Sequence, residues 1–287
     1  MTKARRVLLS IVFPFVLSAQ LPNTEVWLFK VSTSETGTSV LKEPLNISQR
    51  SGYDNQPSFS EDGKNIYYVS VREDNQADIY SYTIRKKETL PFTKTKESEY
   101  SPQISSDGNH IAAVVVEADS AQRIHFKNLL TGLDETKLAF DSVGYYCELN
   151  ADTIVYYKLT EPHSLRYYVR SSKENKWLGD SPIRGFKAVN RHTLIYGLKD
   201  SSKVVFYTYD FLLKKAKHYA EYPSLDEDIC WHEKWGLIKP EGNKLFRYDE
   251  SKAEWLLLFD LSSFGIKKIT RVAFDPKNKY LVIVDNL

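Results

Sequence analysis

Short apolar runs recur along this chain at a nearly constant spacing. The most regular of them are Ile66–Val71, Ile111–Val116, Thr153–Leu159, Thr193–Leu198, Trp235–Lys239 and Tyr280–Val284. Tyr and Phe are abundant while Met occurs once, an aromatic and β-branched bias that suits pleated, half-buried strands. No stretch has the pattern of a long amphipathic helix with caps. The pattern therefore predicts an all-β fold.

A seven-residue motif explains the spacing. Pro57-Ser-Phe-Ser-Glu-Asp-Gly63 recurs 45 positions later as Pro102-Gln-Ile-Ser-Ser-Asp-Gly108, with Pro, Ser, Asp and Gly at the same offsets. The Gly of each Asp-Gly pair supplies the positive φ that a tight hairpin requires. A period of about 40–45 residues built from short strands and such turns is typical of a β-propeller.

The repeat can be followed through the whole chain, although its turns degenerate in the middle. First strands are predicted to begin near Pro57, Pro102, Tyr146, Phe186, Ile229 and Val272. Each is followed by one of the apolar runs above, as a second strand. Third strands are predicted at Asp78–Ile84, Arg123–Leu129, Leu165–Arg170, Val204–Tyr209 and Lys244–Asp249.

The two ends of the chain hold complementary parts of one repeat. Glu25–Val31 has the pattern of a third strand, and residues 38–47 supply a fourth. The C-terminus supplies a first and a second strand, at Arg271–Asp275 and Lys279–Asp285. Together they predict a six-bladed β-propeller of four-stranded antiparallel blades, closed by N- and C-terminal strands that share one blade and leave few free edges. An open array or two smaller sheets is the alternative.

The first nineteen residues have the pattern of a cleaved export signal. Basic residues (Lys3, Arg5 and Arg6) precede an apolar run over residues 7–16 and a small-residue stretch that ends at Ala19. The apolar run is too short to span a bilayer about 30 Å thick as a helix. An N-terminal strand or a buried apolar segment is the alternative. We expect residues 1–19 to be removed, and a protein outside the cytoplasm without stable membrane insertion.

The remaining residues, 20–287, are expected to form one propeller domain. They carry 36 basic and 37 acidic side chains. A nearly neutral chain gives no electrostatic reason to expect nucleic acid as a partner.

Four short segments of the first repeats resemble those of a known family. Gly52–Pro57, Ser60–Gly63, Ser70–Arg72 and Asp78–Tyr80 are similar to the repeat of TolB-type six-bladed propellers. The resemblance is strongest over residues 46–129, weaker over 144–262, and returns at 272–276. It implies the propeller fold and a location in the bacterial envelope. TolB itself has an additional α/β domain before its propeller, which we do not expect here, so the resemblance leaves the TolB partners open.

The sequence lacks the motifs by which common enzyme classes are recognised. The sequence has no Gly-rich phosphate loop, no G-x-S-x-G elbow and no cysteine pair at zinc spacing, and His232-Glu233 lacks the second His of a zinc-protease motif. Cys147 and Cys230 belong to blades separated by a third, which favours two separate buried thiols over a disulfide. The acidic loop Arg72–Asp78 could hold calcium, but a solvated turn is favoured. We expect no metal and no cofactor.

The candidate site is the mouth of the central channel, because the segments that lead into the innermost strands converge there. The candidate ligand-binding residues are Tyr53, Asp54, Asn55, Tyr100, Tyr145, Arg184, Asp228 and Arg271. Tyr and Arg are enriched at binding hot spots. The alternative is that these polar groups only satisfy one another around a water-filled channel.

Two classes of function remain. The favoured one is a monomeric, non-catalytic module that binds an envelope protein or peptide. The alternative is a secreted hydrolase or lyase acting on a glycan, with Asp54 and Asp228 as acid and base. That reaction requires two carboxyl groups about 5–9.5 Å apart in a pocket, at least one of them with a raised pKa.

Overall fold

The computed structural model of the protein describes residues 21–73 and 75–287. Apart from one 3-10 turn at Ser262–Phe264, the regular elements in these residues are β-strands. No helix within the described residues is long and apolar enough to cross a membrane. The predicted export signal, residues 1–19, lies outside the described residues. The all-β prediction is confirmed.

Most strands form four-stranded antiparallel sheets in chain order. The first is β7 (Ser98–Ile104), β8 (His110–Val116), β9 (Gln122–Asn128) and β10 (Asp134–Lys137). The second is β11 (Val143–Glu148), β12 (Thr153–Lys158), β13 (Ser164–Val169) and β14 (Glu174–Asp180). The third is β15 (Pro182–Asn190), β16 (Thr193–Asp200), β17 (Lys203–Asp210) and β18 (Lys215–Tyr222). The fourth is β19 (Cys230–His232), β20 (Gly236–Glu241), β21 (Lys244–Asp249) and β22 (Glu254–Asp260).

The remaining strands form a larger sheet that consists of two antiparallel groups. One group is β3 (Tyr53–Phe59), β4 (Asn65–Val71), β5 (Ala77–Thr83) and β6 (Glu88–Pro91). The other, which we call the terminal sheet, is β23 (Ile269–Phe274), β24 (Tyr280–Asn286), β1 (Thr24–Thr33) and β2 (Ser39–Asn46). A single parallel pairing, Thr24 with Tyr53, joins the two groups.

The N- and C-terminal strands pair along most of their length. β1 and β24 are antiparallel partners from Thr24 opposite Asn286 to Lys30 opposite Tyr280. The predicted mixing of both chain ends in one sheet is therefore present in the structure.

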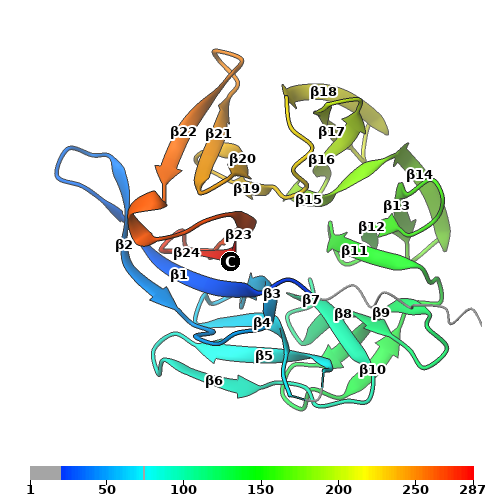
Figure 1. Ribbon diagram of the computed structural model, residues 1–287. Helices are drawn as coiled ribbons and strands as arrows, with labels where there is room; N and C mark the ends of the chain where they lie inside the picture. The colour runs from blue at the N-terminus through cyan, green and yellow to red at the C-terminus, as the bar shows by residue number, and fades with distance from the viewer. Residues whose placement is uncertain (1–20, 74) are drawn as a thin grey trace, which may run out of the picture.

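The sheets radiate from a common centre (Figure 1). Counted in the order given above, the first strand of each sheet, such as β7 or β23, is innermost. The last strand, such as β6 or β10, lies at the periphery. The second strands are buried on both faces, and Ile111 to Val115 of β8 are at most 1% exposed. β10, in contrast, is exposed along its whole length. This gradient explains why the second strands are continuous apolar runs in the sequence, since no face of them meets water.

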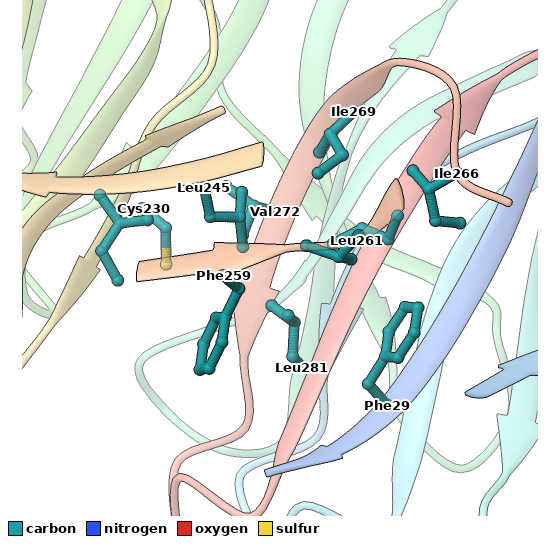
Figure 2. Close-up of a cluster of buried hydrophobic side chains, with 11 residues drawn as sticks. Phe29, Cys230, Leu245, Phe259, Leu261, Ile266, Ile269, Val272 and Leu281 are labelled. Atoms are coloured by element: carbon teal, nitrogen blue, oxygen red, sulfur yellow. The ribbon is translucent and has the colours of Figure 1, made fainter. Parts of the chain in front are cut away.

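The hydrophobic core lies between the sheets. Figure 2 shows a cluster in which Leu245 and Phe259 of the β19–β22 sheet pack near Phe29 and Leu281 of the terminal sheet. A second cluster, with Val26 and Tyr68, joins the terminal sheet to β3–β6. Further clusters join each remaining sheet to the next in chain order. Each sheet therefore uses both faces, and none has a core of its own.

Five of the six predicted first strands began too late, and the sixth, predicted near Ile229, began one residue before the observed β19. β3 starts at Tyr53 and β7 at Ser98, four residues before the proline of each repeat. Pro57 and Pro102 lie inside irregular pairings, where the register shifts between Asn55 and Ser58 and between Tyr100 and Gln103. Proline has no N–H to donate, and a bulge accommodates it within a strand. The proline therefore marks a bulge and not the beginning of the strand.

Candidate functional site: the central channel

The innermost strands surround one cavity of about 190 Å³. Every sheet contributes to its wall. The lining residues are Gln56, Pro57, Ser58 and Phe59; Ser101, Pro102 and Gln103; Tyr145 and Tyr146; Arg184, Phe186 and Lys187; Asp228; and Arg271, Val272 and Ala273. Residues more than 200 positions apart in the sequence therefore share a single site.

Bulges in the innermost strands shape this wall. Besides those in β3 and β7, register shifts occur between Val143 and Tyr145 in β11 and between Ile269 and Arg271 in β23. A bulge bends its strand and turns the following side chain to the other face. Four of the predicted residues, Tyr145, Arg184, Asp228 and Arg271, line the cavity.

Tyrosines and arginines form one electrostatic group beside the cavity. The guanidinium of Arg271 lies 5.6 Å from the ring centre of Tyr145, a cation–π contact. Burial raises the pKa of Tyr53 to about 12, and the charges of Arg271 and Arg184 oppose that rise. The phenol groups of Tyr145 and Tyr100 act on the same pKa. Tyr53 and Tyr100 thus adjoin the group without lining the cavity, and the Tyr53 hydroxyl remains a hydrogen-bond donor at neutral pH.

Arg184 connects three sheets. Its side chain donates to the carbonyl of Thr270 in the terminal sheet at 3.3 Å, and its Nη1 lies 3.8 Å from Glu227, just before β19. The neighbouring Gly185 donates its N–H to the carbonyl of Glu227 at 2.7 Å. A Cβ on Gly185 would lie 2.6 Å from the backbone nitrogen of Ile229, so only glycine allows this approach.

Asp228 has a structural partner. Its Oδ2 accepts a hydrogen bond from the backbone N–H of Val272 at 2.9 Å, across the boundary between the β19–β22 sheet and the terminal sheet. The residue is only 7% exposed.

Asp54 and Asn55 do not line the cavity. Asp54 is fully buried, and its Oδ2 lies 3.0 Å from Nη1 of Arg50 in an ion pair. Burial raises the pKa of the Asp54 carboxyl, while hydrogen bonding to Ser70 and the charge of Arg50 act in the opposite direction. Asn55 is also buried and accepts a hydrogen bond from the backbone N–H of Gln56. Only one of the two carboxylates expected for the glycan-cleaving alternative, Asp228, therefore belongs to the wall of the cavity.

Gln56 and Ser101 lie in segments that were expected to lead into the innermost strands, but they were not among the candidate binding residues. Gln56 and Ser101 occupy the same position in consecutive repeats and both have positive φ, +56° and +53°. The side-chain oxygen of Gln56 accepts the backbone N–H of Ser101 at 2.7 Å, which ties the two sheets together. In the next pair of sheets the direction is reversed, because the side-chain N–H of Gln103 donates to the carbonyl of Tyr146 at 2.9 Å. The repeated residue before the proline was the available signal for this pair.

The other predictions about chemistry concern groups away from the channel mouth. Cys147 and Cys230 are free and buried, as expected, and burial raises the pKa of both thiols. His232 stacks on Trp235 with ring centres 4.1 Å apart. Among the described residues, no group of three or more His, Cys, Asp or Glu is placed to hold a metal ion. The loop considered for calcium contains residue 74, which lies outside the described residues.

Solved structures share this fold. A protein assigned as TolB from Agrobacterium tumefaciens aligns over 93% of this chain and 99% of its own, with a TM-score of 0.68 and 9% identity. TolB from Acinetobacter baumannii aligns over 92% of this chain with a TM-score of 0.57 and 14% identity, and this chain spans 63% of it. An oligogalacturonate lyase from Vibrio parahaemolyticus aligns over 92% of this chain and 98% of its own, with a TM-score of 0.51 and 12% identity.

No protein-family model and no curated protein sequence matches this chain. The structural similarity therefore establishes the fold of TolB-type propellers, as the resemblance of the first repeats implied.

Proposed function

We propose that this protein is an exported, closed six-bladed β-propeller that binds a protein or peptide segment at its central channel without catalysis. The observation that carries the proposal is the convergence of five innermost strands, and of Asp228 just before the sixth, β19, on one cavity lined by Tyr145, Arg184 and Arg271. Large aromatic faces with arginine beside them are typical of binding hot spots. The packing of each sheet on the next, and of the terminal sheet on β3–β6, supports six blades and a closed ring.

The export and envelope location rest on the sequence pattern of residues 1–19 and on the TolB-type fold. Intact-mass measurement of the exported protein tests this part. A protein that begins near Gln20 is expected, and a cytoplasmic protein that retains residues 1–19 would contradict the proposal.

The binding role is tested by affinity capture from an envelope extract with three variants. Tyr145→Ala and Arg184→Ala alter the cavity wall, while Lys86→Ala alters an exposed residue in the turn before β6 and is the control. Loss of a hot-spot side chain costs about 2 kcal/mol or more, which is roughly thirtyfold in affinity. A partner retained by the wild type and the control but lost by both cavity variants supports the proposal. Equal capture by all three variants would place the binding surface elsewhere.

Catalysis is tested separately, because an oligogalacturonate lyase shares the fold. The protein is incubated with polygalacturonate, and new chain ends are measured with Asp228→Asn as the comparison. Turnover that disappears in this variant would favour the glycan-cleaving alternative. The geometry does not support Asp54 and Asp228 as an acid–base pair, since Asp54 forms an ion pair with Arg50 outside the cavity wall.

A further inference from the structure

The wall of the central cavity carries an excess of positive charge. Arg184, Lys187 and Arg271 line it, and Asp228 is the one acidic residue among the lining residues. The Asp228 carboxylate accepts the backbone N–H of Val272, and the three cations outnumber this one carboxylate. The cavity is thus cationic, although the chain as a whole is nearly neutral.

Two of the three cations have no acidic partner. Within residues 21–73 and 75–287, neither Lys187 nor Arg271 has a carboxylate oxygen within 4.0 Å. Arg271 donates to the carbonyl of Thr270 at 2.9 Å, which leaves its charge unneutralised. Arg184 has Glu227 at 3.8 Å, but Glu227 is also paired with Lys199.

The same wall contains buried polar atoms without partners. Ser101 is 7% exposed, and its hydroxyl has no hydrogen-bond partner among the described residues. The same holds for the hydroxyl of Ser58 and for Nε of Arg184. Nearly all buried polar groups in folded proteins have a partner, but these three atoms lie beneath the surface of the wall, so they reach a group in the cavity only after a small shift of the wall. Nε–H can only donate and a hydroxyl can donate, so an acceptor suits these atoms.

We propose that the central channel recognises a carboxylate group of the bound peptide, held by Arg271 and Lys187 with Arg184 as a further cation. This inference rests on the proposed peptide-binding function. A carboxylate offers several acceptor positions to convergent donors, and it is small enough for a cavity of about 190 Å³. The ring of Tyr145, which lines the cavity, then contacts the adjoining apolar part of the peptide. The group is either an Asp or Glu side chain or the C-terminal carboxylate.

The test uses pools of random eight-residue synthetic peptides, with Asp and Glu left out of the random positions, in four forms. Each pool has Glu or Gln at one fixed position and a free or amidated C-terminus, so the two sources of carboxylate are separated. Binding to the purified full chain is compared for the wild type, Arg271→Gln, Lys187→Gln and the exposed control Lys86→Gln. Tyr145→Ala serves as a variant of the channel that keeps its charge.

We expect carboxylate-bearing pools to bind about tenfold more tightly than the pool without carboxylates, given the strength of charge-assisted hydrogen bonds. That preference should vanish in Arg271→Gln and Lys187→Gln and persist in Lys86→Gln. It should also shrink for the wild type as salt rises, a measurement that does not depend on the folding of any variant. The form of the preferred pool identifies a side-chain or C-terminal carboxylate.

Different outcomes of this experiment would contradict carboxylate recognition and the proposed peptide binding. Equal binding of all four pools, lost in Tyr145→Ala, would overturn carboxylate recognition and leave peptide binding intact. Peptide binding that no channel variant changes, or no peptide binding at all, would overturn both. Binding of trigalacturonate in place of the peptides would assign the cationic cavity to an acidic sugar and also overturn the inference.

Discussion

The Asp228 carboxylate and the backbone N–H of Val272 form a hydrogen bond 2.9 Å long. This bond joins the segment before β19 to β23, so it connects the last complete sheet of the chain to the terminal sheet. It lies at the wall of the central cavity, to which both residues contribute. The one carboxylate in the cavity wall thus holds two sheets together.

Asp228→Ala is therefore expected to destabilise the fold. The variant leaves the buried N–H of Val272 without an acceptor, which costs about 1–3 kcal/mol in the free energy of unfolding. Asp228→Asn keeps an oxygen acceptor and should cost less. Urea unfolding of both variants checks this order. Equal stability of the wild type and Asp228→Ala would show that the bond contributes nothing to the junction.

Deletion of residues 271–287 is expected to unfold the protein. The deletion removes most of β23 and all of β24, including Leu281, Val282, Ile283 and Val284, which are fully buried. Each such side chain contributes about 1.5–3 kcal/mol by burial, so the loss is comparable with a whole domain stability of about 5–15 kcal/mol. Circular dichroism during heating provides the measurement, with deletion of Leu287 alone as the control. A cooperative transition near the wild-type temperature in the long deletion would exclude closure by the terminal sheet.

The regular part of the fold was predictable because its signals are local. Asp-Gly turns and fully apolar second strands each depend on a few neighbouring residues, and Gly63 and Gly108 have the expected positive φ. The pairing of β1 with β24 followed from the incomplete repeats at both ends.

The site was harder to predict because its geometry depends on bulges. A shift of one residue reverses which side chains face the channel, and strict alternation from Tyr53 onward cannot show that shift. Asp54 and Asn55 were expected at the channel mouth together with the rest of the segment 53–56, but of these four residues only Gln56 lines the cavity. The ion pair of Asp54 with Arg50 depends on the three-dimensional packing of the loop before β3, which spacing in the sequence does not reveal.

His232 should make the fold sensitive to mild acid. It is buried against Trp235 and Phe274, and burial lowers its pKa to about 4 from an ordinary value of 6.5. Between these values the unfolded chain binds more protons than the folded one, so stability falls as pH decreases from 6.5 to 4. The shift corresponds to an upper limit of about 3 kcal/mol from this group.

His232→Phe should remove this part of the pH dependence. Unfolding in urea at pH 7, 6, 5 and 4 compares it with the wild type and with the exposed control His192→Ala. A stability profile in His232→Phe that falls as steeply as that of the wild type would assign the acid sensitivity to other groups.

Burial of the charged Lys239 side chain is expected to lower the stability of the fold. Its side chain is fully buried, with Nζ 3.5 Å from the ring centre of Tyr222 and 3.9 Å from the nearest oxygen of Asp226. Burial lowers the pKa of Lys239 to about 8 from 10.5, although Asp226 and Glu241 oppose that shift. The unfolded chain therefore binds more protons between pH 8 and 10.5, and wild-type stability should receive a rising contribution across this window.

Replacing Lys239 with Met removes the buried charge while keeping a side chain of similar length. Buried charges can often be replaced by apolar groups without loss, so Lys239→Met should be at least as stable as the wild type at pH 7, with a gain of up to about 3 kcal/mol. Its advantage should shrink as pH rises from 8 to 10.5, because the wild-type amine then becomes neutral. Urea unfolding across this range, with exposed Lys86→Met as the control, measures the difference. A Met variant that is less stable by several kcal/mol at pH 7 would show that the contacts with Tyr222 and Asp226 outweigh the cost of burying the charge.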